Sequence, residues 1–231
     1  MNFLENEFFL LALTFTLFFY AKLLQKKTKI LLLNPILVTV AILIIFLKVF
    51  NIEYETYNKG GQLIEFWLKP AVVALGVPLY LQLETIKKQF VPILLSQLAG
   101  SIIGVVSVVG FAKVFGASQE VILSMAPKSV TTPIAMEVTK SIGGIPSLTA
   151  AVVVCVGLIG AILGFKVLNV MKVNSPIAQG LSIGTAAHAV GTSTAMDISK
   201  KYGAYASLGL TLNGILTAVL TPIILKMMHI I

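Results

Sequence analysis

Long stretches without a charged residue decide what this chain can fold into. Residues 31–47 form one such run, and several more follow along the chain. A helix needs about 20 apolar residues to cross the hydrocarbon core of a bilayer, whereas strands of membrane barrels are about 10 residues long and alternate in polarity. Hydrophobic residues make up 57% of the chain and charged residues only 11%, which is too apolar for a soluble domain. The sequence therefore predicts an all-α polytopic membrane protein.

The apolar runs predict about six transmembrane helices, and the lysines between them predict their orientation. All 17 basic residues are lysines, and the net charge of +8 comes from short clusters between the runs, which indicates membrane topology rather than a nucleic-acid-binding face. The densest cluster, Lys22 to Lys29, follows the first run, so we expect that end in the cytoplasm and both termini outside. The expected spans cover about residues 8–24, 30–50, 63–83, 90–115, 145–171 and 204–228.

Two further segments, Ser118 to Gly143 and Ser175 to Gly203, are more polar and match each other at an offset of 60 residues. Ala135 to Lys140 lies over Ala195 to Lys200 with acidic and basic positions in agreement, which indicates an internal repeat. The centres of both segments are rich in Ser, Thr, Gly or Pro, which discourage a continuous helix. We therefore expect a scaffold or oligomerisation half of four helices (residues 1–115) and a transport core (116–231) with repeat units 116–171 and 175–231.

The broken segments can either cross the membrane or return as re-entrant hairpins. Each limb has about 10 residues, or about 15 Å of helix, which is half of a hydrocarbon core and permits both arrangements. Hairpins would place Lys166 and Lys172 on the cytoplasmic side with Lys200 and Lys201, whereas crossing helices would place the first two outside. The charge pattern therefore favours two re-entrant hairpins in an inverted repeat, with tips that meet near the midplane.

The expected tips carry the candidate residues for binding a substrate. Helix N-termini attract anions, and Lys128 adds a full positive charge that is costly near the midplane unless an anion compensates it. Alternatively, the break is shallow and Lys128 extends to water, while the hydroxyl groups bond the broken backbone locally. The substrate-binding candidates are Lys128, Ser129, Thr131, Thr132, His188, Gly191, Thr192, Ser193 and Thr194.

Three titratable residues near the tips are candidates for coupling a proton to transport. His188 can change charge near neutral pH or serve as a neutral structural residue. Glu137 and Asp197 can relay a proton, or they can simply favour the positive starts of their helices. The sequence has no serine-protease motif and no Cys/His cluster with metal-ligand spacing, and we expect its one cysteine, Cys155, to be packed. We therefore expect neither an enzyme nor a cofactor or metal.

Five sequence blocks carry a resemblance to a known family: Leu32 to Pro35, Pro70 to Leu75, Pro127 to Met136, Gly143 to Pro146 and Gly184 to Thr192. Together they resemble the LrgB/CidB family, which includes YohK-type inner membrane proteins. The resemblance implies a multi-pass protein of the bacterial cytoplasmic membrane. The family was named for holin-like or antiholin-like roles in murein hydrolase export and cell lysis. Its relatives include pyruvate carriers that work with an LrgA-like small membrane subunit, and the plastidic glycolate/glycerate translocator.

Residues and resemblance together predict a membrane carrier for small monocarboxylates of the pyruvate, glycolate or glycerate type. The alternative is a holin-like or antiholin-like oligomeric membrane protein that modulates murein hydrolase export and cell lysis. The expected partners are a small carboxylate, the lipid bilayer, an LrgA/CidA-like small subunit and further copies of the chain in a homodimer or larger homo-oligomer. Nucleic acid is not expected.

The hairpin prediction can be tested by labelling a cysteine at position 172. In a Cys155→Ala background, Lys172→Cys should react with membrane-impermeant reagents only from the cytoplasmic side, because the hairpin arrangement places this loop with the other cytoplasmic lysines. A cysteine near Lys27 is the control, since both arrangements place it inside. Labelling of position 172 from outside would contradict the inverted repeat.

Overall fold

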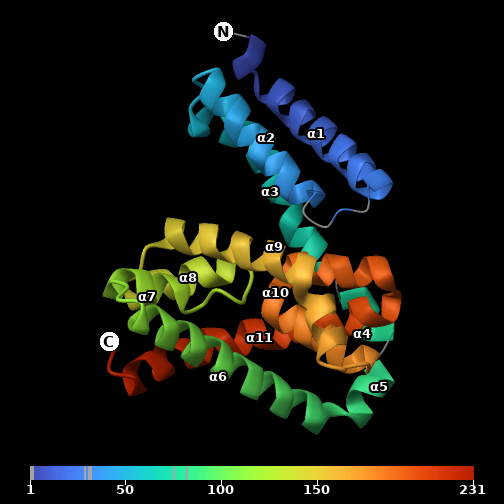
Figure 1. The fold of residues 1–231 in the computed structure, drawn as a ribbon, viewed down its shortest axis with the longest axis vertical. Coiled ribbons are helices and arrows are strands. Elements are labelled where there is room, and N and C mark those ends of the chain that lie inside the picture. Colours follow the sequence, from blue (N-terminus) through green and yellow to red (C-terminus); the bar gives the residue numbers. More distant parts are fainter. Residues whose placement is uncertain (1–2, 29, 31–32, 75, 82) are drawn as a thin grey trace. The chain divides into compact units, whose positions relative to one another are not determined.

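The computed structural model describes residues 3–28, 30, 33–74, 76–81 and 83–231 (Figure 1). The described residues form helices and no strand, which confirms the predicted all-α fold. The chain divides into two compact units, Met1–Ala74 and Leu75–Ile231. Lys29 of the basic cluster, and Leu32 and Leu75 of the family-like blocks, lie outside the described residues.

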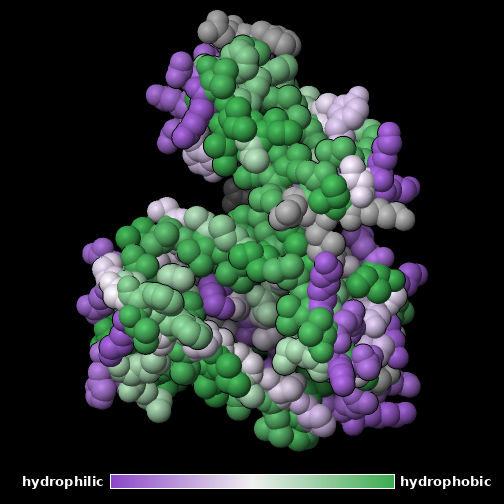
Figure 2. Space-filling view, in the orientation of Figure 1, coloured by the Kyte–Doolittle hydropathy of each residue, from purple (hydrophilic) through white to green (hydrophobic). Residues whose placement is uncertain are grey.

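Four helices among the described residues are long and apolar enough to cross a membrane. They are α1 (Glu7–Thr28), α6 (Phe90–Val114), α9 (Pro146–Val170) and α11 (Lys200–Met227), and the shorter α2 (Pro35–Val49) is also apolar. These five helices correspond to five of the six expected spans. In Figure 2, hydrophobic residues cover much of the visible face of the second unit, and hydrophilic residues gather towards its two sides. The chain is a multi-pass membrane protein.

The third expected span is built differently. In place of one helix over residues 63–83, the structure has α3 (Tyr54–Ala74), α4 (Gly76–Leu81) and α5 (Leu83–Lys88). The helix α3 begins between the second and third expected spans and includes Gly60, although the residues Asn58 to Gly61 favour a turn. A Cβ atom at Gly60 would lie 2.6 Å from the carbonyl oxygen of Glu7, so the glycine allows α3 to pack closely against α1. Tertiary packing thus overrides the local turn preference.

The first unit is a bundle of α1, α2 and α3, preceded by the short 3₁₀ helix η1 (Phe3–Glu5). The start of α2 is set by Asn34, whose side chain accepts hydrogen bonds from the backbone N–H groups of Ile36 and Leu37. Pro35 follows as the first helical residue, where its missing N–H costs nothing. The Asn-Pro pair of this sequence block is therefore a helix start.

The first hairpin of the second unit consists of α7 (Gln119–Met125) and α8 (Thr132–Ile142), with its tip at residues 126–131. Both of its ends lie near the C-terminal end of α11. Ala117 before α7 and Ile142 at the end of α8 both pack against a hydrophobic cluster that contains Ile224 and Leu225 of α11. The Gln119 side chain also donates to the carbonyl oxygen of Ile230. This segment therefore enters and leaves the unit on the same side.

The second hairpin is α10 (Pro176–Ile198), which is divided by non-helical backbone at His188. Its first limb packs on the start of α11, because a Cβ at Gly180 would lie 2.8 Å from the carbonyl oxygen of Tyr202. Its second limb leads through Ser199 directly into α11. Figure 1 shows the two hairpins entering the second unit from opposite sides. The expected pair of opposed hairpins, each followed by a long helix (α9 or α11), is thus present.

The division of the chain by packing differs from the expected functional halves. The predicted scaffold half includes residues 90–115, but α6 belongs to the second compact unit and packs against α11. Ser101 Oγ of α6 donates to Asn213 Oδ1 of α11 at 2.7 Å. A scaffold of residues 1–115 and a transport core of residues 116–231 stay a prediction about function.

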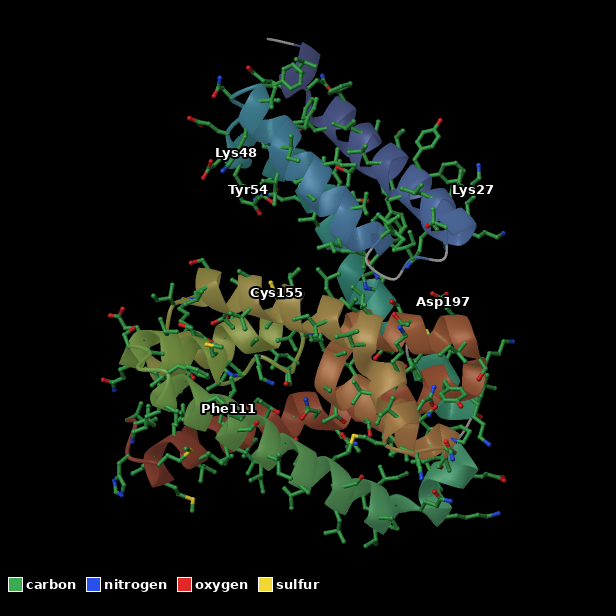
Figure 3. The ribbon with its side chains drawn as sticks, in the orientation of Figure 1. Lys27, Lys48, Tyr54, Phe111, Cys155 and Asp197 are labelled. Carbon is green, nitrogen blue, oxygen red and sulfur yellow. The ribbon has the colours of Figure 1, made fainter. Side chains whose placement is uncertain are left out.

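Cys155 is exposed, so the expectation of a packed thiol is wrong. The helix α9 buries Thr149, Val153 and Gly157, which recur at intervals of four residues along one face. Cys155 lies on a different face of α9, as Figure 3 shows. An apolar run alone does not tell which of its faces is covered by protein.

The helices α10 and α11 make the closest packing of the second unit, and glycines allow it. A Cβ atom at Gly184 would collide with the carbonyl oxygen of Ala206, and one at Gly209 would lie 2.5 Å from the carbonyl oxygen of Leu181. Close approach through small residues is a main source of helix association in membranes, where the hydrophobic effect contributes little between helices. The second hairpin is therefore held on α11 by backbone-to-backbone contact.

Gly184→Ala should destabilise the second unit, since its methyl group must displace the backbone of α11. We expect a loss of about 1–3 kcal/mol or more, measured as a fall in the thermal unfolding midpoint of the purified protein in detergent. Gly110→Ala in α6 is the matched control, because a Cβ there meets no atom within 4 Å. Equal midpoints for the two variants would refute the close packing of α10 on α11.

Candidate functional site

A cavity of about 630 Å³ lies in the second unit between α6, the first hairpin tip, α10 and α11. At one end it reaches Gln89 and Ser175, which directly precede α6 and α10. Its inner end is more polar and lies beside the middle of α11. The polar residues at the inner end are Gln97, Ser101, Lys128, Ser129, Thr185, Asn213 and Thr217. The cavity therefore runs from one end of the long helices to about their midpoint.

Lys128 is the charged residue of this inner end. It lies in the turn that forms the first hairpin tip, is half-buried, and donates from Nζ to Ser129 Oγ at 2.9 Å. Within the part of the chain that the structure describes, Lys128 has no carboxylate partner. An ammonium group inside a membrane protein is costly unless an anion compensates it. The side chain is therefore suited to binding a negatively charged ligand in the cavity.

The other polar groups at this end are mostly bonded to each other. Asn213 is 1% exposed and contacts both hairpins, because its Nδ2 donates to the carbonyl oxygens of Ser129 at 2.8 Å and Thr185 at 3.0 Å. The Thr185 hydroxyl lies 2.5 Å from the Gln97 side-chain oxygen. These neutral groups bring α6, α11 and both hairpins together around the inner end of the cavity.

His188 lies at the break of α10, but its side chain points to α9. Its Nε2 lies 2.8 Å from the carbonyl oxygen of Val153, which can only accept, so Nε2 carries the proton of this hydrogen bond. A Cβ on Gly157 of α9 would lie 2.5 Å from the imidazole Cε1, so the ring packs tightly on that helix. The imidazole is not part of the cavity lining. It anchors the second hairpin tip to α9.

The hydroxyl groups after His188 bond their own helix. Thr192 Oγ1 donates to the His188 carbonyl oxygen at 2.8 Å, and Ser193 and Thr194 both donate to the carbonyl oxygen of Val190. Such local bonds are usual for Ser and Thr beside a helix break. Gly191 is buried against the preceding limb, since a Cβ there would meet Ala187 at 2.5 Å. The structure brings none of these four candidates to the cavity.

The remaining candidates also lie outside the cavity lining. Thr131 precedes α8 and Thr132 begins it, so a helix N-terminus is present at the first tip as expected, but neither side chain lines the cavity. Glu137 is exposed on α8. Asp197 is exposed at the end of α10 (Figure 3). Of all the predicted binding residues, Lys128 and Ser129 line the cavity. Among the described residues, no group of three His, Cys, Asp or Glu side chains is placed to hold a metal ion.

The sequence analysis missed the polar residues that α6 and α11 contribute to the site. Gln97 and Ser101 lie in one apolar run, and Asn213 and Thr217 lie in another. Their position within apolar runs is itself a signal in the sequence. A polar side chain within a membrane span is costly, so it is usually functional or bonded to another polar group. The predicted site residues all lie in the polar broken segments, whereas these four are isolated polar residues within apolar spans.

Comparison with known proteins agrees with this architecture. The model of the LrgB-like family matches residues 14–227. The chain belongs to the LrgB-like family. It is 38% identical over 218 residues to the uncharacterized protein YwbG of Bacillus subtilis (strain 168), a match that covers 94% of this chain and 97% of that protein. It is 40% identical over 191 residues to the antiholin-like protein LrgB of Bacillus mycoides (strain KBAB4), with 83% of each chain covered.

This match confirms the resemblance of the five sequence blocks to the LrgB/CidB family. YxaC of Bacillus subtilis (strain 168) is a further relative, 38% identical over 207 residues and 90% of each chain. No solved structure matches the chain.

The backbone of His188 allows a prediction that separates its conformation from its imidazole. His188 has φ 41° and ψ −135°, in a region that glycine tolerates and other residues occupy at a cost of about 1–3 kcal/mol. His188→Gly and His188→Ala both remove the bond to Val153, but only the glycine relieves the backbone strain. The glycine variant should therefore unfold at a higher temperature than the alanine variant in detergent. The opposite order would refute the strained conformation at this break.

Proposed function

We propose that this LrgB-like protein carries small monocarboxylates across the bacterial cytoplasmic membrane. The observation that carries the proposal is Lys128, a half-buried ammonium group without a carboxylate partner among the described residues, at the inner end of a cavity. A bound carboxylate would compensate its charge and would meet the Ser129 hydroxyl beside it. Opposed hairpins whose tips meet beside a binding site are typical of carriers built from inverted repeats.

The direction in which the cavity opens fits this proposal. Lys87 and Lys88 end α5, Lys172 lies between α9 and α10, and Lys200 and Lys201 begin α11. This is the end of the unit to which the cavity leads, and by the bias of cytoplasmic loops towards lysine it faces the cytoplasm. The described conformation would then offer its anion site to the cytoplasmic side, with both termini of the chain outside. Proton coupling through His188, Glu137 or Asp197 belongs to the same proposal.

A second candidate function rests on the names of the relatives. Several proteins about 40% identical to this chain are named antiholin-like protein LrgB, and those names favour this second function over the carrier. In this case the chain would act as an oligomeric membrane protein that modulates murein hydrolase export and cell lysis. An LrgA-like small membrane subunit is a proposed partner for either function.

Uptake measurements on proteoliposomes distinguish the two functions. The parent protein should take up labelled pyruvate, glycolate or glycerate with a saturable dependence on concentration. Lys128→Ala should reduce the affinity about 10- to 150-fold, because a charge-assisted contact with a buried anion contributes about 1.5–3 kcal/mol. Lys128→Arg should also be impaired, since a planar guanidinium group does not replace a compact ammonium group in a narrow site.

Lys140→Ala is the matched control, because Lys140 is an exposed lysine on α8 outside the cavity lining. This variant should keep the uptake of the parent. Saturation curves that do not change in Lys128→Ala would remove the proposed anion site. Flux that does not saturate in the parent would favour an oligomeric pore and with it the second candidate function.

A further inference from the structure

Asn213 makes four hydrogen bonds that use its whole amide group. Its Nδ2 donates to the carbonyl oxygens of Ser129 and Thr185, and its Oδ1 accepts from Ser101 Oγ at 2.7 Å and Thr217 Oγ1 at 3.1 Å. Backbone carbonyls can only accept, so the NH₂ side of the amide must face the two hairpins. The hydroxyl groups of Ser101 and Thr217 hold the oxygen in the opposite direction. The orientation of the side chain is thereby determined.

The two carbonyl groups that Asn213 binds lie beside the two helix breaks. In a continuous helix, Ser129 C=O would accept from residue 133, which is Pro133 and has no N–H. Thr185 precedes the non-helical backbone of His188 by three residues. An unbonded carbonyl in an apolar interior is strongly disfavoured. One side chain of α11 thus bonds a backbone carbonyl beside each break.

The bond to the first hairpin also positions the charged residue of the cavity. Ser129 follows Lys128 in the tip turn, and the Ser129 hydroxyl accepts from Lys128 Nζ. The first tip lacks a helical bond at this point, so its backbone is held by the Asn213 amide. A displacement of the Ser129 carbonyl would displace the Lys128 ammonium group with it. The same amide bonds the second hairpin at Thr185, so it ties the position of one tip to that of the other.

We propose that Asn213 is a positioning residue that holds both hairpin tips in register and thereby places Lys128 and Ser129 at the inner end of the cavity. The expected effect of Asn213 on transport rests on the proposed anion site. Its expected effect on the position of the first tip does not depend on that site. Asn213 acts on the substrate through Lys128 and Ser129. It differs in this respect from Thr211 of the same helix, which bonds only the carbonyl of Ser207 on its own helix.

The position of the tip can be measured without a substrate. In a Cys155→Ala background, Ser129→Cys introduces a thiol at the tip, and its rate of reaction with a maleimide in detergent reports how far the tip is exposed. Asn213→Leu, which keeps the volume but removes both donors, should accelerate this reaction about tenfold or more. Thr211→Val is the matched control on α11 and should leave the rate unchanged. Ser96→Cys, on the exposed α6 wall of the cavity, should react at the same rate with or without Asn213→Leu.

Ser101→Ala is the second variant. It tests whether the Asn213 amide holds the first tip if Asn213→Leu does not fold. It removes one of the two bonds that orient the amide, so Ser129→Cys should react about three- to tenfold faster, with an unchanged rate at Ser96→Cys. Equal Ser129→Cys rates in the parent and the variant that folds would overturn the proposal. Equal acceleration at both cysteines would also overturn it, since that is the result of general loosening.

Uptake separates this inference from the proposed function. With Ser129 restored, Asn213→Leu should raise the KM for carboxylate uptake about tenfold or more and change the maximal rate less, because Lys128 is displaced but still present. A parent that takes up no carboxylate, combined with faster tip labelling, would remove the proposed function and keep the positioning role. Saturable uptake that does not change in Asn213→Leu, combined with unchanged labelling, would keep the function and remove the role of Asn213.

Discussion

The second unit depends on the need to bond backbone groups wherever a helix is broken inside an apolar interior. A continuous helix satisfies its own carbonyls, but a re-entrant hairpin frees several of them at its tip. The structure answers this need with a side chain from a neighbouring helix, since Asn213 of α11 bonds a backbone carbonyl beside each break. The imidazole of His188 adds a contact between the second tip and α9, because it bonds the carbonyl of Val153. The hairpins are therefore stable only together with the helices that surround them.

This requirement also explains why the polar residues of the chain gather at the inner end of the cavity. Each polar group that satisfies a break is itself satisfied by another, as Ser101 and Thr217 do for Asn213. Lys128 differs from these groups, because among the described residues its charged Nζ bonds the neutral Ser129 hydroxyl and no carboxylate. The described residues of this end therefore form a neutral hydrogen-bonded network beside one ammonium group.

The names of the relatives and the cavity around Lys128 support different candidate functions. Several relatives about 40% identical to this chain are named antiholin-like protein LrgB, and the second candidate function rests on those names. The proposed carrier function rests on the cavity with Lys128. A protein that moves a carboxylate and a protein that modulates lysis share the same multi-pass, all-α architecture, so the fold by itself is compatible with both.

Much of this architecture was predictable because it is encoded in local patterns. Apolar runs predict α1, α2, α6, α9 and α11, the 60-residue repeat and the lysine clusters predict two opposed hairpins, and the proline-rich tip predicts Lys128 and Ser129 as site residues. Tertiary structure decided which side chains meet. It turned His188 towards α9, left Thr192 bonded to its own helix, exposed Cys155, and brought Asn213 to carbonyls 84 and 28 residues away in the sequence. Hydropathy and repeats determine which segments are buried in a membrane, but the rotation of each helix about its axis depends on close packing with helices that are distant in the sequence.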